Sequence, residues 1–224
     1  DVSEDVFYAD FESFECESTG RHIPYLACAT PRGGGFFIVK ANPRIIKTDV
    51  NESLGKELLA AICKKSDKKN IKIYFHNLRY DANFLYDAGL TQIKSIEDDA
   101  RLYQLQGVFT INKTTYNLTI RDTYSYLTCR LADFDSMFDI KSGAKWNDFP
   151  YQIFKRNTLS DLFPSNTLFA PEELELIPQQ YKQNPSSVEI YRYASDYCKQ
   201  DVLVLQQGFD QFREKALELG IDVD

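Results

Sequence analysis

Two carboxylates, Asp10 and Glu12, lie two residues apart in a short apolar segment that favours a β-strand. Side chains alternate along a strand, so both carboxylates are expected on one face, where the strand ends. Charged oxygens among apolar residues are costly unless they are neutralised, and hard oxygen ligands suit Mg²⁺ or Mn²⁺. The pattern alone is weak, because D-x-E is expected about once by chance in a chain of this composition. An ordinary acidic pair at a loop end is the competing interpretation.

The hexapeptide HNLRYD, from His76 to Asp81, follows the apolar segment IKIYF and precedes a helical stretch. Asp81 is therefore expected at or near a helix N-terminus, where a carboxylate is favourable. A structural interpretation makes Asp81 a helix cap, His76 a semi-buried side chain and Asn77 a turn residue. A functional interpretation places Asp81 in the outer shell of a metal ion and makes Asn77 a hydrogen-bond donor to a substrate.

The pentapeptide YCKQD places Tyr197 and Asp201 four residues apart, on one face of a predicted helix. A core tyrosine beside a surface acid would explain this pattern, which is also expected about once by chance. In the functional interpretation, Asp201 completes a metal site and the Tyr197 hydroxyl orients an attacking water molecule.

The three patterns occur in one chain and would bring four acids together from two strands and two helices. Such a set is what a two-metal phosphodiester hydrolase requires: one ion activates water and the other stabilises the leaving oxygen. The chain has only two histidines, His22 and His76, so carboxylates are the ligands available for this chemistry.

Hydrophobic periodicity indicates the elements that must position these acids. Strands are predicted over 6–11, 23–30 and 36–40, with a glycine turn at 33–35, and they form an antiparallel meander. Downstream we expect a helix over 54–64, a strand over 71–75, a helix beginning within 81–87, a hairpin over 101–124 with its turn at Asn112 and Lys113, a short helix over 131–138 and a long helix over 186–219. This order predicts an α/β domain with a mixed sheet, an antiparallel meander plus parallel strands, flanked by helices.

The D-x-E, N-x-x-x-D and Y-x-x-x-D set resembles the three motifs of the DEDDy 3′→5′ exonucleases, which have a ribonuclease H-like fold. The segments YADFES, YFHNLRYDANFL and YCKQDVLVL are similar to the exonuclease domain of the protein-primed family B DNA polymerases of phages, adenoviruses and linear plasmids. The HNL prefix is the specific part of this likeness. The resemblance extends from Phe7 to about Phe212 and implies a single exonuclease domain over 1–224, excised from a longer polymerase.

The resemblance also implies roles for individual residues. Two divalent ions, Mg²⁺ or Mn²⁺, would be held by Asp10, Glu12, Asp81 and Asp201, with Tyr197 as the phenol that positions water. Contacts to the 3′ end of single-stranded DNA would come from His76, Asn77 and Tyr80, with Phe14 as a further stacking ring.

Two weaker matches complete the resemblance. Thr123 and Leu127 fit a Ser/Thr-Leu-x-x-hydrophobic motif that contacts single-stranded DNA, although Tyr124 replaces its leucine. Lys145 is the best match to a catalytic lysine and Lys141 is the alternative. A lysine there would stabilise phosphorane charge or fix the aspartate of the third motif, whereas simple solvent exposure is the competing explanation.

Composition sets limits on these predictions. The net charge is −7, from 26 basic and 33 acidic residues, whereas a general nucleic-acid binder is usually basic. Two bound divalent ions would offset four of these negative charges. An attached polymerase domain would also hold the duplex, so weak, salt-sensitive, metal-dependent DNA binding is expected.

The remaining features concern context. Five cysteines without a CxxC pair favour reduced thiols in an intracellular protein over disulfides or a zinc site. No apolar run approaches the roughly 18 residues of a membrane span, and no targeting segment is visible. A chain that starts at Asp1 is expected to come from a longer protein. That protein is expected to act at a viral or linear-plasmid replication site. Residues 141–185, marked by prolines, are expected to be irregular and to form a family-specific insertion.

The sequence therefore predicts a proofreading exonuclease that removes 5′-mononucleotides from the 3′ end of single-stranded or frayed DNA. Its predicted partners are that DNA end, a polymerase domain in the parent chain and a terminal (priming) protein, with no membrane. Two other functions stay open: a free-standing DEDDy exonuclease that acts on RNA, and a catalytically silent module that binds a primer strand or a priming protein.

Overall fold

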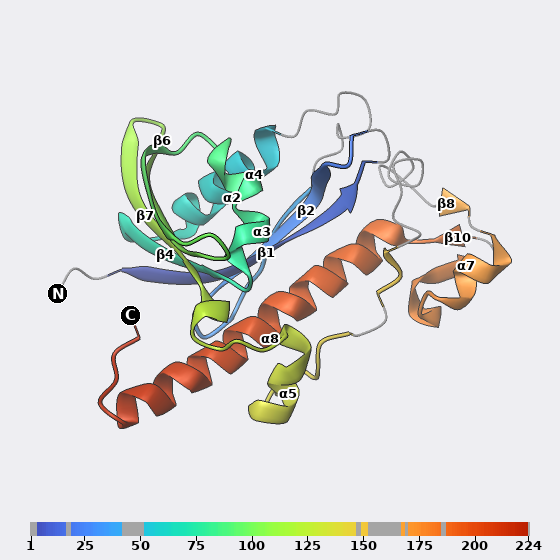
Figure 1. The fold of residues 1–224 in the computed structure, drawn as a ribbon. Helices are drawn as coiled ribbons and strands as arrows, with labels where there is room; N and C mark the ends of the chain where they lie inside the picture. Colours follow the sequence, from blue (N-terminus) through green and yellow to red (C-terminus); the bar gives the residue numbers. More distant parts are fainter. Residues whose placement is uncertain are drawn as a thin grey trace.

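A seven-stranded mixed sheet forms the centre of the molecule (Figure 1). The computed structural model describes residues 4–16, 19–41, 52–146, 149–151, 167–168, 170–184 and 187–223. The order of the strands across the sheet is β3-β2-β1-β4-β7-β6-β5. Their bounds are Asp5–Glu15 (β1), His22–Pro31 (β2), Ile38–Ala41 (β3), Asn70–Phe75 (β4), Thr91–Glu97 (β5), Leu102–Ile111 (β6) and Thr114–Asp122 (β7).

The pairing of the strands confirms the predicted mixed sheet. β1, β2 and β3 form an antiparallel meander, whereas β1 pairs with β4, and β4 with β7, in parallel. β6 and β7 form the predicted hairpin. Its turn lies at Asn112 and Lys113, whose φ angles are 49° and 66°, the positive values that a tight two-residue hairpin turn requires.

Helices cover both faces of the sheet (Figure 1). The long helix α8 (Ile190–Glu218) packs against β1 and β2 on one face, with α5 (Phe134–Met137) beside it. The other face carries α2 (Glu52–Lys65), α3 (Leu78–Asp81) and α4 (Asn83–Tyr86). Alternation along β1 divides its side chains between two cores: Tyr8 packs on the α8 side, and Phe7 and Phe11 pack on the α2 side. By the same alternation Asp10 and Glu12 belong to the α8 side.

The structure corrects two details of the predicted element pattern. The helix expected within 81–87 begins at Leu78 and is split into α3 and α4, so Asp81 ends α3 instead of starting a helix. The cause is Asn77, which adopts a left-handed conformation (φ 66°, ψ 53°), so that the helix begins three residues after β4 ends. β5 is the second difference: all seven of its residues are exposed, so no alternating burial signals a strand.

The segment 141–185, expected to be irregular, contains regular structure within its described part. A second sheet has the order β8-β10-β9, and short helical turns lie around it. The bounds of these elements are Thr167–Leu168 (β8), Pro171–Glu175 (α7), Gln179–Tyr181 (η4), Lys182–Asn184 (β9) and Ser187–Val188 (β10), and two further 3₁₀ turns are η1 (Thr123–Ser125) and η2 (Leu131–Asp133). The predicted irregularity of 147–148, 152–166, 169 and 185 falls outside the described residues.

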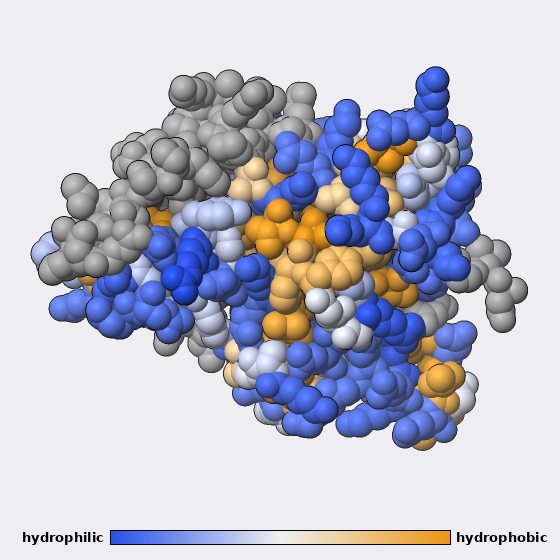
Figure 2. Space-filling view, turned by 180° about the vertical axis from the view of Figure 1, so that it is seen from behind, coloured by the Kyte–Doolittle hydropathy of each residue, from blue (hydrophilic) through white to orange (hydrophobic). Residues whose placement is uncertain are grey.

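The surface opposite to the view of Figure 1 has a limited apolar area at its centre, bordered by hydrophilic residues (Figure 2). Among the described residues, no helix combines the length and apolar character needed to cross a bilayer.

Candidate active site

A cavity of about 430 Å³ opens beside the end of β1, between α3 and α8. All four predicted acids line it: Asp10, Glu12, Asp81 and Asp201. Its wall also contains Ser13, His76, Asn77, Tyr80, Lys145 and Tyr151. Residues up to 191 positions apart in the sequence thus face one space, as the three motifs predicted.

Local backbone features bring the acids together. The pairing of β1 with β2 shifts register between Glu12 and Ser13, where β1 passes the cavity. The left-handed turn at Asn77 is held by Asp122 at the end of β7, whose Oδ1 accepts the backbone N–H groups of Asn77 at 2.8 Å and of Tyr124 at 2.9 Å. Asp122 thereby fixes the start of the helix that carries Asp81. No motif in the sequence marks this residue.

The cavity concentrates negative charge in a poorly hydrated place. Burial, followed by repulsion from Asp201, raises the pKa of Asp10 to about 7. Burial and neighbouring carboxylates likewise raise the pKa of Glu12 and of Asp81 well above the usual range, and burial raises the pKa of Asp201. These carboxyl groups therefore resist ionisation together unless a positive charge joins them.

Two buried oxygens mark where such a charge fits. Asp81 and Asp201 are only 3% and 5% exposed, and the Oδ1 atom of each has no hydrogen-bond partner within the described part of the chain. An unpaired buried carboxylate oxygen is costly, and an all-oxygen donor set is what Mg²⁺ or Mn²⁺ prefers. The four acids thus fit the predicted divalent ions.

Lys145 connects two of the predicted motif residues. Its Nζ donates to the Tyr197 hydroxyl at 2.7 Å, forms an ion pair with Asp201, and lies 4.6 Å from the centre of the Tyr197 ring. The alternative, Lys141, is exposed to solvent. Geometry therefore favours Lys145 as the lysine of the site, a choice that the sequence left open.

Tyr197 is buried beside the cavity and is not among the residues that line it. Its hydroxyl lies 2.9 Å from the Tyr151 hydroxyl, and the Phe149 ring packs 3.9 Å from its own ring, centre to centre. Burial raises the pKa of Tyr197, so the phenol stays protonated. Tyr151, 56% exposed, belongs to the segment interpreted as an insertion, and its only sequence signal is the aromatic run that follows Lys145.

The other predicted DNA-contact residues differ in how they are placed. Both ring nitrogens of His76 have partners, Thr123 Oγ1 and the Cys129 carbonyl, each at 2.9 Å, which supports the structural interpretation of this histidine. Tyr80 is 38% exposed, and its hydroxyl lies 2.5 Å from Ser13 Oγ and 2.7 Å from His22 Nδ1. Its ring edge is therefore anchored while the rest faces the cavity.

Phe14, Thr123 and Leu127 are not brought to the cavity. Phe14 and Leu127 pack into the α8-side core, and Thr123 is fully buried with its hydroxyl near His76 and the Phe75 carbonyl. The expected base stacking on Phe14 and the expected DNA contacts of the other two thus receive no support from their positions. Packing in the apolar interior explains Phe14 and Leu127, and hydrogen bonds explain the burial of Thr123.

Comparisons with known proteins find similarity to DNA polymerases. A family model for DNA polymerase type B, organellar and viral, matches residues 62–223. A DNA polymerase of Kluyveromyces lactis is 22% identical over 243 residues, which cover 98% of this chain and 23% of that protein.

Solved structures of phi29 DNA polymerase have the same fold over nearly the whole chain. The complex with single-stranded DNA matches with a TM-score of 0.57 and 15% identity, covering 97% of this chain and 32% of the polymerase. The complex with primer-template DNA matches with a TM-score of 0.57 and 13% identity, covering 98% of this chain and 32% of the polymerase. The chain therefore spans about a third of these structures.

Proposed function

The chain belongs to the organellar and viral type B DNA polymerases, and from this membership we propose that it is a metal-dependent 3′→5′ exonuclease. Its substrate would be the 3′-terminal phosphodiester bond of single-stranded or frayed DNA. The observation that carries the proposal is the convergence of Asp10, Glu12, Asp81 and Asp201 on one cavity, with two buried oxygens that lack partners in the described part of the chain.

Asp10, Glu12, Asp81 and Asp201 would hold two divalent ions, Mg²⁺ or Mn²⁺. Such ions, when bound, activate a water molecule and stabilise the leaving oxygen of the scissile bond. The carboxylates must be ionised to bind them, and the ions in turn offset the repulsion that raises the pKa of these acids.

Lys145, Tyr197 and Tyr151 form a hydrogen-bonded group that would orient the attacking water. The Lys145 ammonium pairs with the Asp201 carboxylate, and its positive charge would stabilise the negative charge that develops on the phosphoryl oxygens. Because the Tyr197 phenol keeps its proton, it acts as a fixed hydrogen-bonding group and does not act as a base.

The remaining cavity wall offers a binding surface for a DNA 3′ end. The partly exposed rings of Tyr80 and Tyr151 would stack on bases, which tolerates any sequence, and Asn77 would donate to the terminal nucleotide. A mismatched end unstacks more easily than a paired one, so such a site would act preferentially on misincorporated nucleotides. The likeness to phi29 DNA polymerase in complex with single-stranded DNA supports this substrate.

The chain covers about a third or less of the length of these relatives, so polymerisation would reside in other parts of the parent protein. We accordingly propose that residues 1–224 are the proofreading domain of a protein-primed polymerase, with the polymerase domain and a terminal protein as partners. Replication of a viral genome or a linear plasmid is the setting that these assignments suggest.

The test uses a single-stranded DNA oligonucleotide labelled at its 5′ end, with Mn²⁺ or Mg²⁺, and an RNA of the same sequence. We expect a ladder that shortens from the 3′ end, faster degradation of DNA than of RNA, and complete inhibition by a chelator. Faster degradation of RNA would support the RNA exonuclease instead. No degradation of either oligonucleotide with either ion would support the silent binding module.

A further inference from the structure

The third motif contains a residue to which the proposed mechanism gives no role. Gln200 lies within YCKQD, is partly exposed and does not line the cavity. Its amide Nε2 donates to three consecutive backbone carbonyls, those of Ser142 at 3.2 Å, Gly143 at 2.6 Å and Ala144 at 3.1 Å. Lys145 is the next residue of the chain. Gln200 therefore holds the backbone that leads directly into the lysine of the site.

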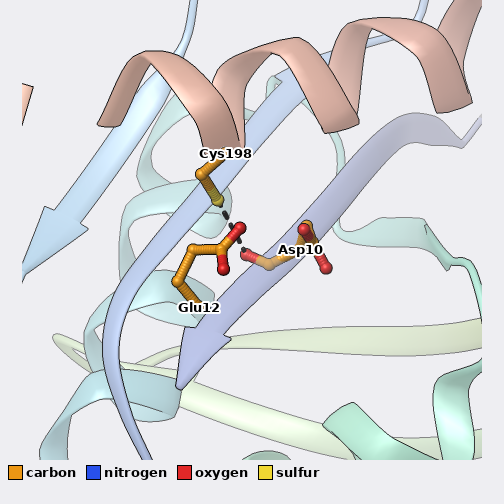
Figure 3. A group of neighbouring side chains, drawn as sticks. All are labelled: Asp10, Glu12 and Cys198. Atoms are coloured by element: carbon orange, nitrogen blue, oxygen red, sulfur yellow. Dashed lines mark hydrogen bonds between the residues drawn. The ribbon is translucent and has the colours of Figure 1, made fainter. Parts of the chain in front are cut away.

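The geometry of α8 explains why Gln200 faces this segment and not the sheet. Cys198, two residues earlier, points to β1, where its Sγ donates to the Asp10 carbonyl at an S···O distance of 3.8 Å (Figure 3). Successive residues of an α-helix are turned by about 100°, so residues two apart point in nearly opposite directions. Gln200 accordingly leaves α8 on the side away from β1, where residues 142–144 lie.

One turn of α8 thus holds Lys145 from two directions. Tyr197 and Asp201 bind its Nζ, the former by a hydrogen bond of 2.7 Å and the latter as an ion pair. Gln200 binds the carbonyls of the three residues that precede it. Because carbonyl oxygens only accept hydrogen bonds, position 200 must supply a donor.

The segment that carries Lys145 depends on contacts of this kind. Among the described residues, no helix or strand lies between α5 and Lys145. Gln207 and Gln211, further along α8, hold the earlier part of the segment. Of these three glutamines, Gln200 contacts the residues closest to the lysine. A lysine side chain has many rotamers, so its ammonium occupies one place only where its backbone is also fixed.

We propose that Gln200 is a positioning residue that acts through Lys145. By holding residues 142–144, it sets where the Lys145 ammonium lies between Tyr197 and Asp201. That this placement serves DNA hydrolysis rests on the proposed exonuclease function, whereas the placement itself does not.

A double-mutant cycle tests the route of action. Gln200→Met retains a long unbranched side chain and removes the donor. We expect the turnover number of the 224-residue chain for DNA hydrolysis to fall by about 10- to 100-fold, the loss typical of a residue that orients a group of the site, with KM unchanged. In a Lys145→Ala background the same change should cause no further loss, because the lysine through which it acts is absent. An equal loss in both backgrounds, or none in the parent, would overturn the proposal.

One substitution made at two glutamines of α8 tests the need for a donor. Gln207 uses the other end of its amide, since its Oε1 accepts from the backbone N–H of Ser142 at 3.2 Å. Glutamate keeps an acceptor but cannot donate when ionised. Gln200→Glu should therefore lower the turnover number, whereas Gln207→Glu, the matched control with the same added charge, should keep the parent rate. Equal rates for these two variants would contradict the proposal.

A readout without DNA separates this inference from the exonuclease function. Trp146, the only tryptophan of the chain, follows Lys145, and its ring stacks on that of Tyr193 with 6.3 Å between ring centres. Loss of the Gln200 contacts should loosen this segment, so acrylamide should quench Trp146 fluorescence more strongly in Gln200→Met than in the parent or in Gln207→Glu. Equal quenching in the three proteins would overturn the placement, even if the parent is inactive. Stronger quenching in Gln200→Met beside an inactive parent would support the placement and contradict the exonuclease function.

Discussion

The acids of the cavity raise one another's pKa because each is buried and each faces other carboxylates. Each motif alone was weak, but the three in one chain predicted that these acids converge, and all four line one cavity. Sequence could not separate Lys145 from Lys141, because that choice depends on how the chain after α5 folds back onto α8. Nor could it identify Tyr151, whose neighbours are defined by the same path.

The raised pKa of Asp10 predicts a pH-dependent gain in stability for Asp10→Asn in metal-free protein. The folded chain keeps a proton up to about pH 7 that the unfolded chain releases near its ordinary pKa of 3.8, so the parent loses stability as pH rises through this window. We expect the melting temperature of Asp10→Asn to equal that of the parent near pH 3.8 and to exceed it increasingly up to about pH 7. Above about pH 7 the difference between the two melting temperatures should stay constant.

Asp99→Asn, at an exposed aspartate, is the control and should show no such trend. Saturating Mn²⁺ should narrow the difference in melting temperature at neutral pH, because binding at about 100 times its dissociation constant stabilises the parent by about 2.7 kcal/mol. A parent that is more stable than Asp10→Asn throughout the metal-free series would contradict this account of the cavity.

Lys145→Ala should lower the turnover number for DNA hydrolysis by about 10²- to 10³-fold, the loss typical of a preorganised electrostatic group. The substitution removes the cation that fixes Asp201 and the donor to Tyr197. Lys141→Ala, at the exposed alternative, should retain the parent rate. Equal rates for both variants and the parent, with circular dichroism showing a folded chain, would remove Lys145 from the mechanism.

At the scale of elements, the site depends on the strand–turn–helix unit that carries Asp81. This unit is held in place by the packing of α4 on α2, where the two backbones approach closely. A Cβ atom on Gly55 of α2 would lie 2.0 Å from the Phe84 carbonyl oxygen of α4. Only glycine permits this contact.

Gly55→Ala should therefore destabilise the fold. Alanine in place of glycine would by itself stabilise a helix by about 1 kcal/mol, but the clash with backbone costs about 1–3 kcal/mol or more, so the clash outweighs the gain. Thermal unfolding should show a lower melting temperature for Gly55→Ala and little change for Lys56→Ala at the adjacent exposed position. A melting temperature above that of the parent would show that α2 and α4 do not meet as described.

Hydrophobic periodicity predicted the strands and helices that bury one face or two, including β1, β4, the β6–β7 hairpin and α8. It could not predict β5, whose residues are all exposed, nor the short strands β8, β9 and β10, which have too few residues to show a period. The early start of α3 was also hidden, because it follows from the positive φ of Asn77 and the hydrogen bonds of Asp122.

At the scale of the whole molecule, the charge of −7 means that the proposed DNA binding would depend on the cavity and on divalent ions held there. We expect the 224-residue chain to bind a single-stranded oligonucleotide weakly, only with divalent ions, and with an affinity that falls linearly with salt concentration on logarithmic axes. Fluorescence anisotropy with Lys145→Ala, which keeps all four acids and hydrolyses DNA slowly on this account, measures this with and without divalent ions. Binding that is tight in a chelator would point to a basic surface that the composition does not predict.

We propose that the four converging acids make this chain an exonuclease. Comparing the rates at which the parent and Asp10→Ala/Asp201→Ala shorten a 5′-labelled single-stranded DNA in Mn²⁺ tests this proposal. The account predicts stepwise 3′→5′ degradation by the parent and a rate at least about 10³-fold lower for the double variant, because loss of ligands removes the metal chemistry as a unit. Equal rates for the two proteins, or an inactive parent, would contradict it.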